Sequence, residues 1–412
     1  MSCKTFRWWI WFVLLLALAS SPAAAQTYTV LRRFTGNTNP GPEPGGPLSL
    51  DSAGNLYGTT FFGGDFSCDS PLGCGTVFRL NTAGKLASAS LNGTDGQGPV
   101  GGVLFDSRGN AYGVGSTGGD LNCNSGTGCG TVYKVSHSGV LSALYTFTGT
   151  DGNQPVGGLI TTGGKLFGVT VAGGSNNLGA IFSVDSSGAE SVLHNFAGVD
   201  GASPDGRLIA DGSGNLYGTA SSGGGPNLGV AFQLATSGGK ETVLHAFDGP
   251  PFDAYSPSGV LAMGKDGSIY GTSTFGGNGT AEYCDQFGCG AIFKLTPSQG
   301  GWTETLIYSF QGAADGAFPS GVVIDAAGNL YGTTSSGGDL SCGSPYGCGV
   351  VFRLDAQGNF RVLHTFHGND GAHPTVAPLL DSAHKALYGS TAIGGNTECG
   401  GGGCGVIWRI TP

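Results

Sequence analysis

The stretch Asp51-Ser-Ala-Gly-Asn-Leu-Tyr-Gly-Thr-Thr60 recurs with variations seven times along this chain. Each copy keeps an aromatic residue followed by glycine, and successive aromatic residues are 55, 55, 50, 53, 61 and 57 positions apart. The aromatic residues are Tyr57, Tyr112, Phe167, Tyr217, Tyr270, Tyr331 and Tyr388. Such a period is too long for a repeat of a single helix or coil, and it suits a four-stranded propeller blade.

One complete unit shows where the strands are expected. The apolar or β-branched runs 322–324, 330–334, 349–354 and 360–366 are separated by two turn sequences, 325–329 and 355–359, and by a cysteine-containing loop. Gly328 can adopt the positive φ that a tight turn needs, and Asp325 can bond the turn amides. The unit therefore predicts four short antiparallel strands.

The two ends of the chain complement each other. Residues 28–34 match the fourth strands of the units, whereas residues 406–410 match the third strands, so the last unit lacks one strand. Pairing of the first segment with the last would protect the exposed strand edges. The sequence predicts an all-β, seven-bladed β-propeller with four antiparallel strands per blade, formed by one domain over residues 26–412 and closed by the N-terminal strand.

Two other repeated positions carry aromatic or histidine side chains. We expect the tyrosines of the repeat and a second aromatic series on the third strands to pack between adjacent sheets. That series comprises Phe78, Tyr133, Phe182, Phe232, Phe293, Phe352 and Trp408. His194, His245 and His364 share one fourth-strand position with Tyr145, Tyr308 and Arg32, which is interpreted as a position on the outer surface.

Residues 1–25 have the features of a secretory signal peptide. Lys4 and Arg7 precede a short apolar run over 8–19, and Ala23-Ala24-Ala25 offers small residues for cleavage. The run is shorter than the roughly 20 residues that span a bilayer. We expect no membrane span and a mature protein that is secreted, either periplasmic or extracellular.

The charge balance restricts the partners. Loss of Lys4 and Arg7 with the signal leaves 15 basic against 27 acidic residues. This acidic balance disfavours nucleic acid as a partner. Glycine is abundant, at 81 of 412 residues, but its fixed register within the repeats indicates ordered turns.

Ten of the eleven cysteines form five close pairs, each in the loop after the second strand of a unit. The pairs are Cys68/Cys74, Cys123/Cys129, Cys284/Cys289, Cys342/Cys348 and Cys399/Cys404. The third and fourth units lack both members. Cysteines that are present or absent together predict local disulfides and an oxidising compartment. Zinc is a weaker interpretation, because these loops contain no histidine.

The units have the form Gly-x-Leu-x-x-Asp-x-x-Gly-Asn-Leu-Tyr-Gly-Thr-Thr, followed by Gly-Cys-Gly-x-Val-Phe-x-Leu. This pattern resembles the "GloVer" tandem repeat of bacterial choice-of-anchor proteins, from Thr27 to Pro412. The resemblance implies an exported bacterial repeat protein and supplies no catalytic residues. The phrase Asp-x-x-Gly-Asn-Leu-Tyr is also similar, more distantly, to NHL-type propellers.

A repeated aspartate in the loops between fourth and first strands gives the first candidate site. Its copies are Asp95, Asp151, Asp200, Asp315 and Asp370. Placed around the channel mouth, these carboxylates would bind a cation or sugar hydroxyls. The alternative is that each caps the amides of its own turn. We expect no metal centre and no cofactor, and a structural Ca²⁺ ion is the single exception considered.

Aromatic residues in the cysteine loops give the second candidate site. Rings beside carboxylates suit carbohydrate, because a ring packs against the apolar face of a sugar. The alternative is that the rings cover the disulfides. The residues that we single out are Phe62, Phe66, Tyr283, Phe287 and Tyr346.

These observations predict an exported, non-catalytic propeller that binds a glycan or another extracellular or envelope surface, a protein included, through a loop face braced by the disulfides. One alternative is a polysaccharide lyase or glycoside hydrolase that uses acids at the channel mouth, with Glu282, Glu398 and His373 as further polar candidates. Another is a purely structural envelope protein. Phosphate-loop, zinc-protease and serine-hydrolase motifs are absent from the sequence.

Overall fold

The computed structural model describes residues 26–36, 41–68, 72–237, 239–396, 398–399 and 401–411. The predicted signal peptide lies outside these residues. Within them, β-strands are the dominant regular secondary structure. The described helices are two short 3₁₀ segments, η1 (Asn124–Gly126) and η2 (Glu282–Phe287).

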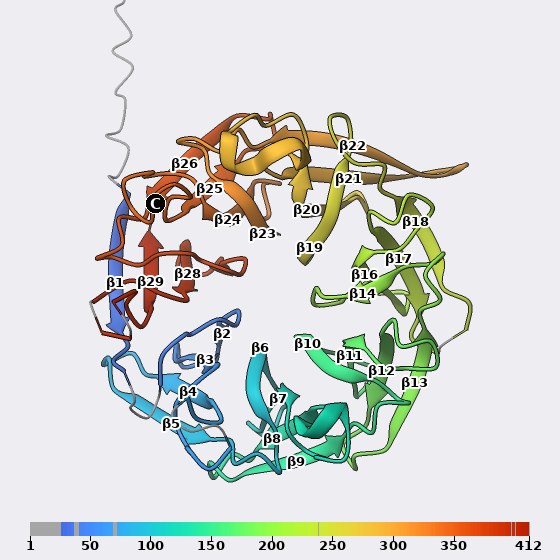
Figure 1. Ribbon diagram of the computed structural model, residues 1–412, viewed down its shortest axis with the longest axis vertical. Helices are drawn as coiled ribbons and strands as arrows, with labels where there is room; N and C mark the ends of the chain where they lie inside the picture. The colour runs from blue at the N-terminus through green and yellow to red at the C-terminus, as the bar shows by residue number, and fades with distance from the viewer. Residues whose placement is uncertain are drawn as a thin grey trace, which may run out of the picture.

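The strands follow one another in antiparallel sheets, most of them with four strands. The first three sheets each run in chain order from an inner to an outer strand (Figure 1). They comprise β2 (Ser49–Leu50), β3 (Leu56–Thr60), β4 (Thr76–Leu80) and β5 (Leu86–Ser90); β6 (Gln97–Phe105), β7 (Ala111–Thr117), β8 (Thr131–Val135) and β9 (Leu141–Thr146); and β10 (Asn153–Thr162), β11 (Lys165–Ala172), β12 (Ala180–Val184) and β13 (Glu190–Asn195).

The next sheet has its inner strand broken into two pieces, β14 and β15, which both pair with β16. Two further antiparallel groups, β19 to β22 and β23 to β26, are joined by a single parallel bridge between Val260 and Gly321. The strands are β14 (Ala202–Pro204), β15 (Ile209–Ala210), β16 (Asn215–Ser222), β17 (Val230–Ala235) and β18 (Thr242–Ala246); β19 (Ala254–Met263), β20 (Ile269–Gly276), β21 (Ala291–Ser298) and β22 (Gly301–Ser309); and β23 (Ala317–Ile324), β24 (Leu330–Ser336), β25 (Val350–Leu354) and β26 (Phe360–Thr365).

The last sheet combines both ends of the chain. Its strands β27 (Leu379–Asp381), β28 (Ala386–Thr391) and β29 (Val406–Thr411) are followed by the N-terminal strand β1 (Thr27–Arg33). β1 pairs antiparallel with β29, from Thr27 opposite Thr411 to Arg33 opposite Val406. Figure 1 shows the sheets arranged in a circle, with β1 on the perimeter and β29 next to it on the inner side.

A local hydrogen-bond network explains why the repeated phrase folds the same way in four of its copies. Asp325 accepts the amides of Ala327 and Asn329 through Oδ1, at 2.8 and 2.9 Å. Its Oδ2 accepts the side-chain amide of Asn329 at 2.7 Å and the hydroxyl of Tyr331 at 3.1 Å. Gly328 supplies the positive φ of 85° that closes the turn. The same network surrounds Asp51, Asp106 and Asp211.

The core lies between neighbouring sheets, as the aromatic pattern predicts. All seven third-strand aromatics, from Phe78 to Trp408, are at most 1% exposed. The repeat tyrosines are less uniformly buried: Tyr57, Tyr270, Tyr331 and Tyr388 are half-buried. In four copies, at Tyr57, Tyr112, Tyr217 and Tyr331, the hydroxyl bonds the turn aspartate.

Glycine allows the inner strands to approach each other closely. A Cβ atom on Gly101 would meet the backbone of Gly158, and one on Gly206 would meet the carbonyl of Gly259. The inner strands therefore contact one another backbone to backbone, which a larger residue at these positions would prevent.

Each of the five predicted cysteine pairs is a disulfide, with Cα atoms 5.0 to 5.5 Å apart. This confirms the prediction of local bonds. Among the described residues, no helix is both long enough and apolar enough to cross a membrane.

The second cysteine in each pair lies in the core, so the disulfides that close the loops also anchor them between the sheets. Cys74, Cys129 and Cys404 are at most 1% exposed, and each packs in a hydrophobic cluster between sheets. Each lies two residues before a third strand, whose side chains are buried on both faces of the sheet. Cys289 and Cys348 are buried in the same way. These five cysteines are therefore core residues and cannot contact a ligand.

The backbone of the same five cysteines connects neighbouring sheets. The carbonyl of Cys74 accepts the amide of Gly98 at 3.0 Å, and that of Cys129 accepts the amide of Gln154 at 3.0 Å. The carbonyl of Cys404 accepts the amide of Glu43 at 3.2 Å, which joins the last sheet to the first. Each disulfide thus fixes a loop to a point where one sheet bonds the next.

Candidate functional site

The repeated loop aspartates occupy equivalent positions with equivalent contacts. In each, a carboxylate oxygen accepts a backbone amide three or four residues earlier, at 2.7 to 2.9 Å. Four of them also bond a side chain of the fourth strand: Tyr145 with Asp151, His194 with Asp200, Tyr308 with Asp315, and His364 with Asp370. The fifth, Asp95, is 6% exposed.

These contacts correct the expected position of the acids. The fourth strands form the perimeter in Figure 1, so the carboxylates lie beside the outer strands and not around the channel mouth. The capping alternative describes what their oxygens do in the turns. It does not account for the bonds that four of the carboxylates also make to a side chain of the fourth strand.

The histidine position on the fourth strand is also less exposed than expected. The side chains of His194, His245 and His364 are 15%, 23% and 16% exposed. Each Nε2 lies 2.9 to 3.1 Å from an aspartate Oδ2. For His245 the partner is Asp253, a residue that the sequence analysis missed because its loop is longer.

Beyond each pair of an aspartate and a fourth-strand side chain, a third residue comes from the outer strand of the next sheet or from the position just before that strand. At three places where the outer strands of neighbouring sheets meet, this third residue is a glutamate: Glu190, Glu241 or Glu304. Burial, followed by the charge of the neighbouring aspartate, raises the pKa to about 7 for Glu190, about 8 for Glu241 and about 7 for Glu304. All three lie four residues before a fourth-strand Tyr or His, a signal that the sequence contains.

The aromatic candidates fall into two groups. Tyr283 contacts Tyr346 edge to face, with ring centroids 5.7 Å apart and an interplanar angle of 79°. Phe287 belongs to the same cluster through Phe275, at 6.0 Å. By contrast, Phe62 packs against Phe61 at 4.9 Å, and Phe66 projects separately, 38% exposed.

Phe318 and Tyr255 complete this aromatic cluster, and the sequence analysis missed both. Phe318 lies 5.5 Å from Phe275 and 6.1 Å from Tyr283, while Tyr255 lies 5.4 Å from Phe275. The backbone of Phe318 is left-handed, with φ of 56°, and its amide donates to the carbonyl of Cys289 at 2.9 Å. This strained residue before a proline places a ring from β23 against the loop of the preceding sheet.

Disulfides fix the two exposed rings of the cluster. Phe287 lies between Cys284 and Cys289, and Tyr346 lies between Cys342 and Cys348. Phe287 is 42% exposed and Tyr346 is 51% exposed. The aromatic cluster thus presents two rings to solvent from short, covalently closed loops.

Tyr283 has a different role from its exposed neighbours. Its hydroxyl donates to the carbonyl of Gly312. Burial and the charge of Asp315 raise its pKa to about 12. Tyr283 therefore supports Tyr346 and stays protonated at physiological pH.

The polar residues considered for catalysis have separate partners. His373 Nδ1 lies 2.8 Å from the carbonyl oxygen of Ser335, and Glu398 accepts the amide of Gly36 at 3.0 Å. Glu282 is exposed within η2. None of these contacts joins one candidate to another.

A half-buried acid and a half-buried base between the inner strands are further residues that the sequence analysis missed. Asp205 and Arg207 flank Gly206, whose neighbours are the inner strands of both adjoining sheets. Asp205 Oδ1 and Arg207 Nε have no hydrogen-bond partner among the described residues. Burial raises the pKa of Asp205 to about 7 and lowers that of Arg207.

A family model of the Gloeobacter/Verrucomicrobia repeat matches residues 19–211, 67–283 and 278–412. The chain belongs to this repeat family. The match confirms the resemblance that the repeated phrase indicated. No curated protein matches the chain.

Solved structures resemble this member of the repeat family in fold. Virginiamycin B lyase from Staphylococcus aureus has a TM-score of 0.59 at 14% identity, covering 94% of this chain and all of that chain. A fungal alcohol oxidase of the AA5 family has a TM-score of 0.58 at 14% identity, and the match covers 90% of this chain and 75% of that chain. The extracellular domain of BT4673 from B. thetaiotaomicron has a TM-score of 0.54 at 12% identity, and the match covers 94% of this chain and 42% of that chain.

At these identities the likeness establishes the fold alone. The repeat-family member is an all-β protein with propeller-like structural neighbours. The activities named for those proteins are theirs.

Proposed function

We propose that this protein is an exported binding protein, built as a closed seven-bladed propeller, that recognises glycans through its aromatic cluster. Seven repeats and the pairing of β1 with β29 support the closed ring. Five disulfides support export to an oxidising compartment, outside the cytoplasm.

The observation that carries the glycan proposal is the pair of exposed rings, Phe287 and Tyr346. They are held in disulfide-closed loops of neighbouring sheets and connected through the half-buried rings of Phe275, Phe318 and Tyr283. A sugar presents an apolar face of C–H groups that packs on such rings. Because the rings are already ordered, binding would cost little side-chain entropy.

Polar residues around Phe287 supply the hydrogen bonds that a sugar requires. Glu282, Asp285 and Gln286 are exposed in the same η2 segment. Carboxylate and amide oxygens accept hydrogen bonds from hydroxyl groups. The combination of rings and acceptors favours a neutral or basic glycan over an acidic one, since the protein already carries a negative net charge.

Affinity electrophoresis of the mature protein through gels containing neutral polysaccharides, preceded by a glycan array, tests this proposal. Phe287→Ala and Tyr346→Ala should each weaken binding by about 1–2 kcal/mol, roughly 5- to 30-fold. Phe252→Ala is the matched control, because Phe252 is 89% exposed and lies outside the aromatic cluster. Equal losses in all three variants, or none in the first two, would refute the assigned surface.

The enzymatic alternative is supported by Asp205. A carboxyl with a pKa near 7 is suited to proton transfer at neutral pH, and Arg207 lies two residues away. A lyase or hydrolase would release unsaturated or reducing sugars from the polysaccharides that bind. Product formed by the natural protein and lost in Asp205→Asn would replace the binding proposal with this one.

A further inference from the structure

The outer strands of neighbouring sheets meet at a repeated position. Each outer-strand junction combines a fourth-strand residue, the loop residue that follows it, and a residue of the next outer strand. Tyr145 and Glu190 represent one junction, with the hydroxyl 3.5 Å from Glu190 Oε2. His364 and Tyr28 represent another, with stacked rings 3.6 Å apart.

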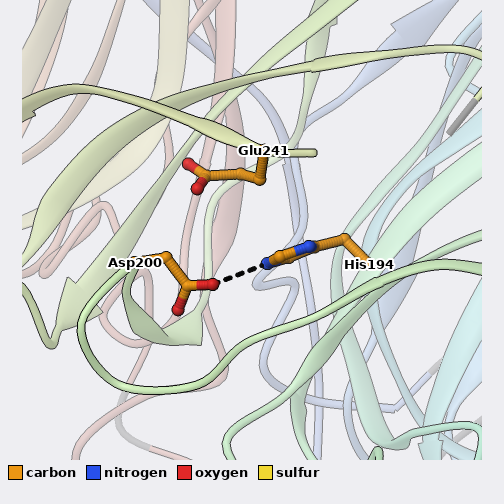
Figure 2. A group of neighbouring side chains, drawn as sticks. All are labelled: His194, Asp200 and Glu241. Atoms are coloured by element: carbon orange, nitrogen blue, oxygen red, sulfur yellow. Dashed lines mark hydrogen bonds and ion pairs between the residues drawn. The ribbon is translucent and has the colours of Figure 1, made fainter. Parts of the chain in front are cut away.

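One junction, between β13 and β18, brings together His194, Asp200 and Glu241. One imidazole nitrogen and one oxygen from each carboxylate all lie within 4.8 Å of one another. His194 Nε2 is 3.1 Å from Asp200 Oδ2. Figure 2 shows the Glu241 carboxylate directed toward the same space from a separate segment of the chain.

Glu241 is the observation that indicates a missing partner. It is 5% exposed, and its Oε1 has no hydrogen-bond partner among the described residues. A buried carboxylate without a partner is strongly unfavourable. Its nearest acidic neighbour, Asp200, adds repulsion. A cation bound between the two carboxylates would satisfy both.

The next junction, between β18 and β22, repeats the arrangement. His245 Nε2 lies 3.0 Å from Asp253 Oδ2, and one oxygen of Glu304 completes a group within 4.8 Å. Asp253 is 8% exposed, and Glu304 Oε1 is buried without a hydrogen-bond partner among the described residues. Recurrence of three residue types at one structural position argues against chance placement of surface acids.

We propose that these two outer-strand junctions each bind a divalent transition-metal ion, with Zn²⁺ as the first ion to test. One imidazole nitrogen and two carboxylate oxygens are a donor set that such ions accept, and water can fill the remaining position. The ion would replace the proton shared between His Nε2 and Asp Oδ2. It would link the outer strand of one sheet to that of the next.

The chain contains an internal control for the glutamate. The junction of His364 and Asp370 has the same histidine–aspartate pair, at 2.9 Å, but Tyr28 stands where the other two have glutamate. Asp370→Asn therefore removes an equivalent pair from a junction with two candidate ligands instead of three. It should leave metal binding unchanged.

Isothermal titration of the chelator-treated mature protein with Zn²⁺, with metal content measured after desalting, tests the proposal. We expect two ions per natural chain, one in Glu241→Gln, and none retained in Glu241→Gln/Glu304→Gln, with affinity at each altered site at least about tenfold lower. Glutamine keeps the shape of the side chain and removes a buried charge, so folding should persist; circular dichroism verifies it.

Thermal unfolding provides the second measurement. Zn²⁺ should raise the melting temperature of the natural protein and of Asp370→Asn, and it should not raise that of the double glutamine variant. Absence of saturable Zn²⁺ binding overturns the proposal. So does unchanged stoichiometry in the double variant, which would place the ion at exposed pairs such as His367 with Asp339.

Discussion

Replacement of Phe34 by alanine tests whether β1 is an integral part of the last sheet. Phe34 directly follows β1 and is 2% exposed. Its ring lies 5.4 Å from that of Phe78 at an interplanar angle of 60°. Its amide donates to the carbonyl of Gly405 at 3.1 Å, next to the first residue of β29.

The loss of stability expected for Phe34→Ala can be compared with that of an equivalent residue within the chain. Phe196 directly follows β13, is fully buried, and lies 5.3 Å from Phe232 at 63°, almost the geometry of Phe34 with Phe78. Removing a buried phenylalanine side chain costs about 3–5 kcal/mol, through lost burial and the cavity left behind. If the ring is closed, Phe34→Ala and Phe196→Ala should lower the free energy of unfolding by similar amounts.

Urea unfolding monitored by tryptophan fluorescence measures both costs. Val199→Ala is the surface control, because Val199 is 81% exposed, and its effect should stay within about 0.5 kcal/mol. A loosely docked β1 would detach before the rest unfolds. A cost below about 1 kcal/mol for Phe34→Ala, with the full cost for Phe196→Ala, would therefore refute closure by β1.

Three further predictions concern the disulfides and Asp205. Peptide mapping of the unreduced protein should return five bonds, each within one loop, and a bond between loops would contradict the assignment. The double variant Cys342→Ser/Cys348→Ser should lose about 2 kcal/mol of stability through loop-closure entropy and about 1–3 kcal/mol through a hydroxyl at the buried position of Cys348, and a loss above about 5 kcal/mol would show a wider structural role. Asp205 binds its proton more tightly in the folded state, so stability should fall as the pH rises from about 4 to about 7, by at most about 4 kcal/mol. Urea unfolding at pH 5 and pH 8 should show this dependence in the natural protein and a weaker one in Asp205→Asn; equal slopes would exclude the assigned pKa.

The sequence alone determined the features that depend on neighbours along the chain. The turn network of Asp325 is completed by Tyr331, six residues later, so the same residue pattern builds the same turn wherever it recurs. The disulfides join cysteines only five or six positions apart. Short loops of this kind leave few alternative geometries, which is why the repeated strands, turns and cystine loops could be predicted.

Only the tertiary structure decided which side chains meet across the sheets. Glu241 reaches Asp200 from 41 positions away, and Tyr346 reaches Tyr283 from 63 positions away. Burial of Cys74 likewise depends on a neighbouring sheet, although its bond to Cys68 is local. These contacts depend on the angle between neighbouring sheets. Glycine lets the inner strands approach closely, whereas large aromatic rings separate the outer strands, and the two spacings together set that angle. The repeat placed most of these aspartates within six to eight residues of the fourth-strand side chain that they bond, but the packing of the outer strands decided where a glutamate of the next sheet lies beside such a pair.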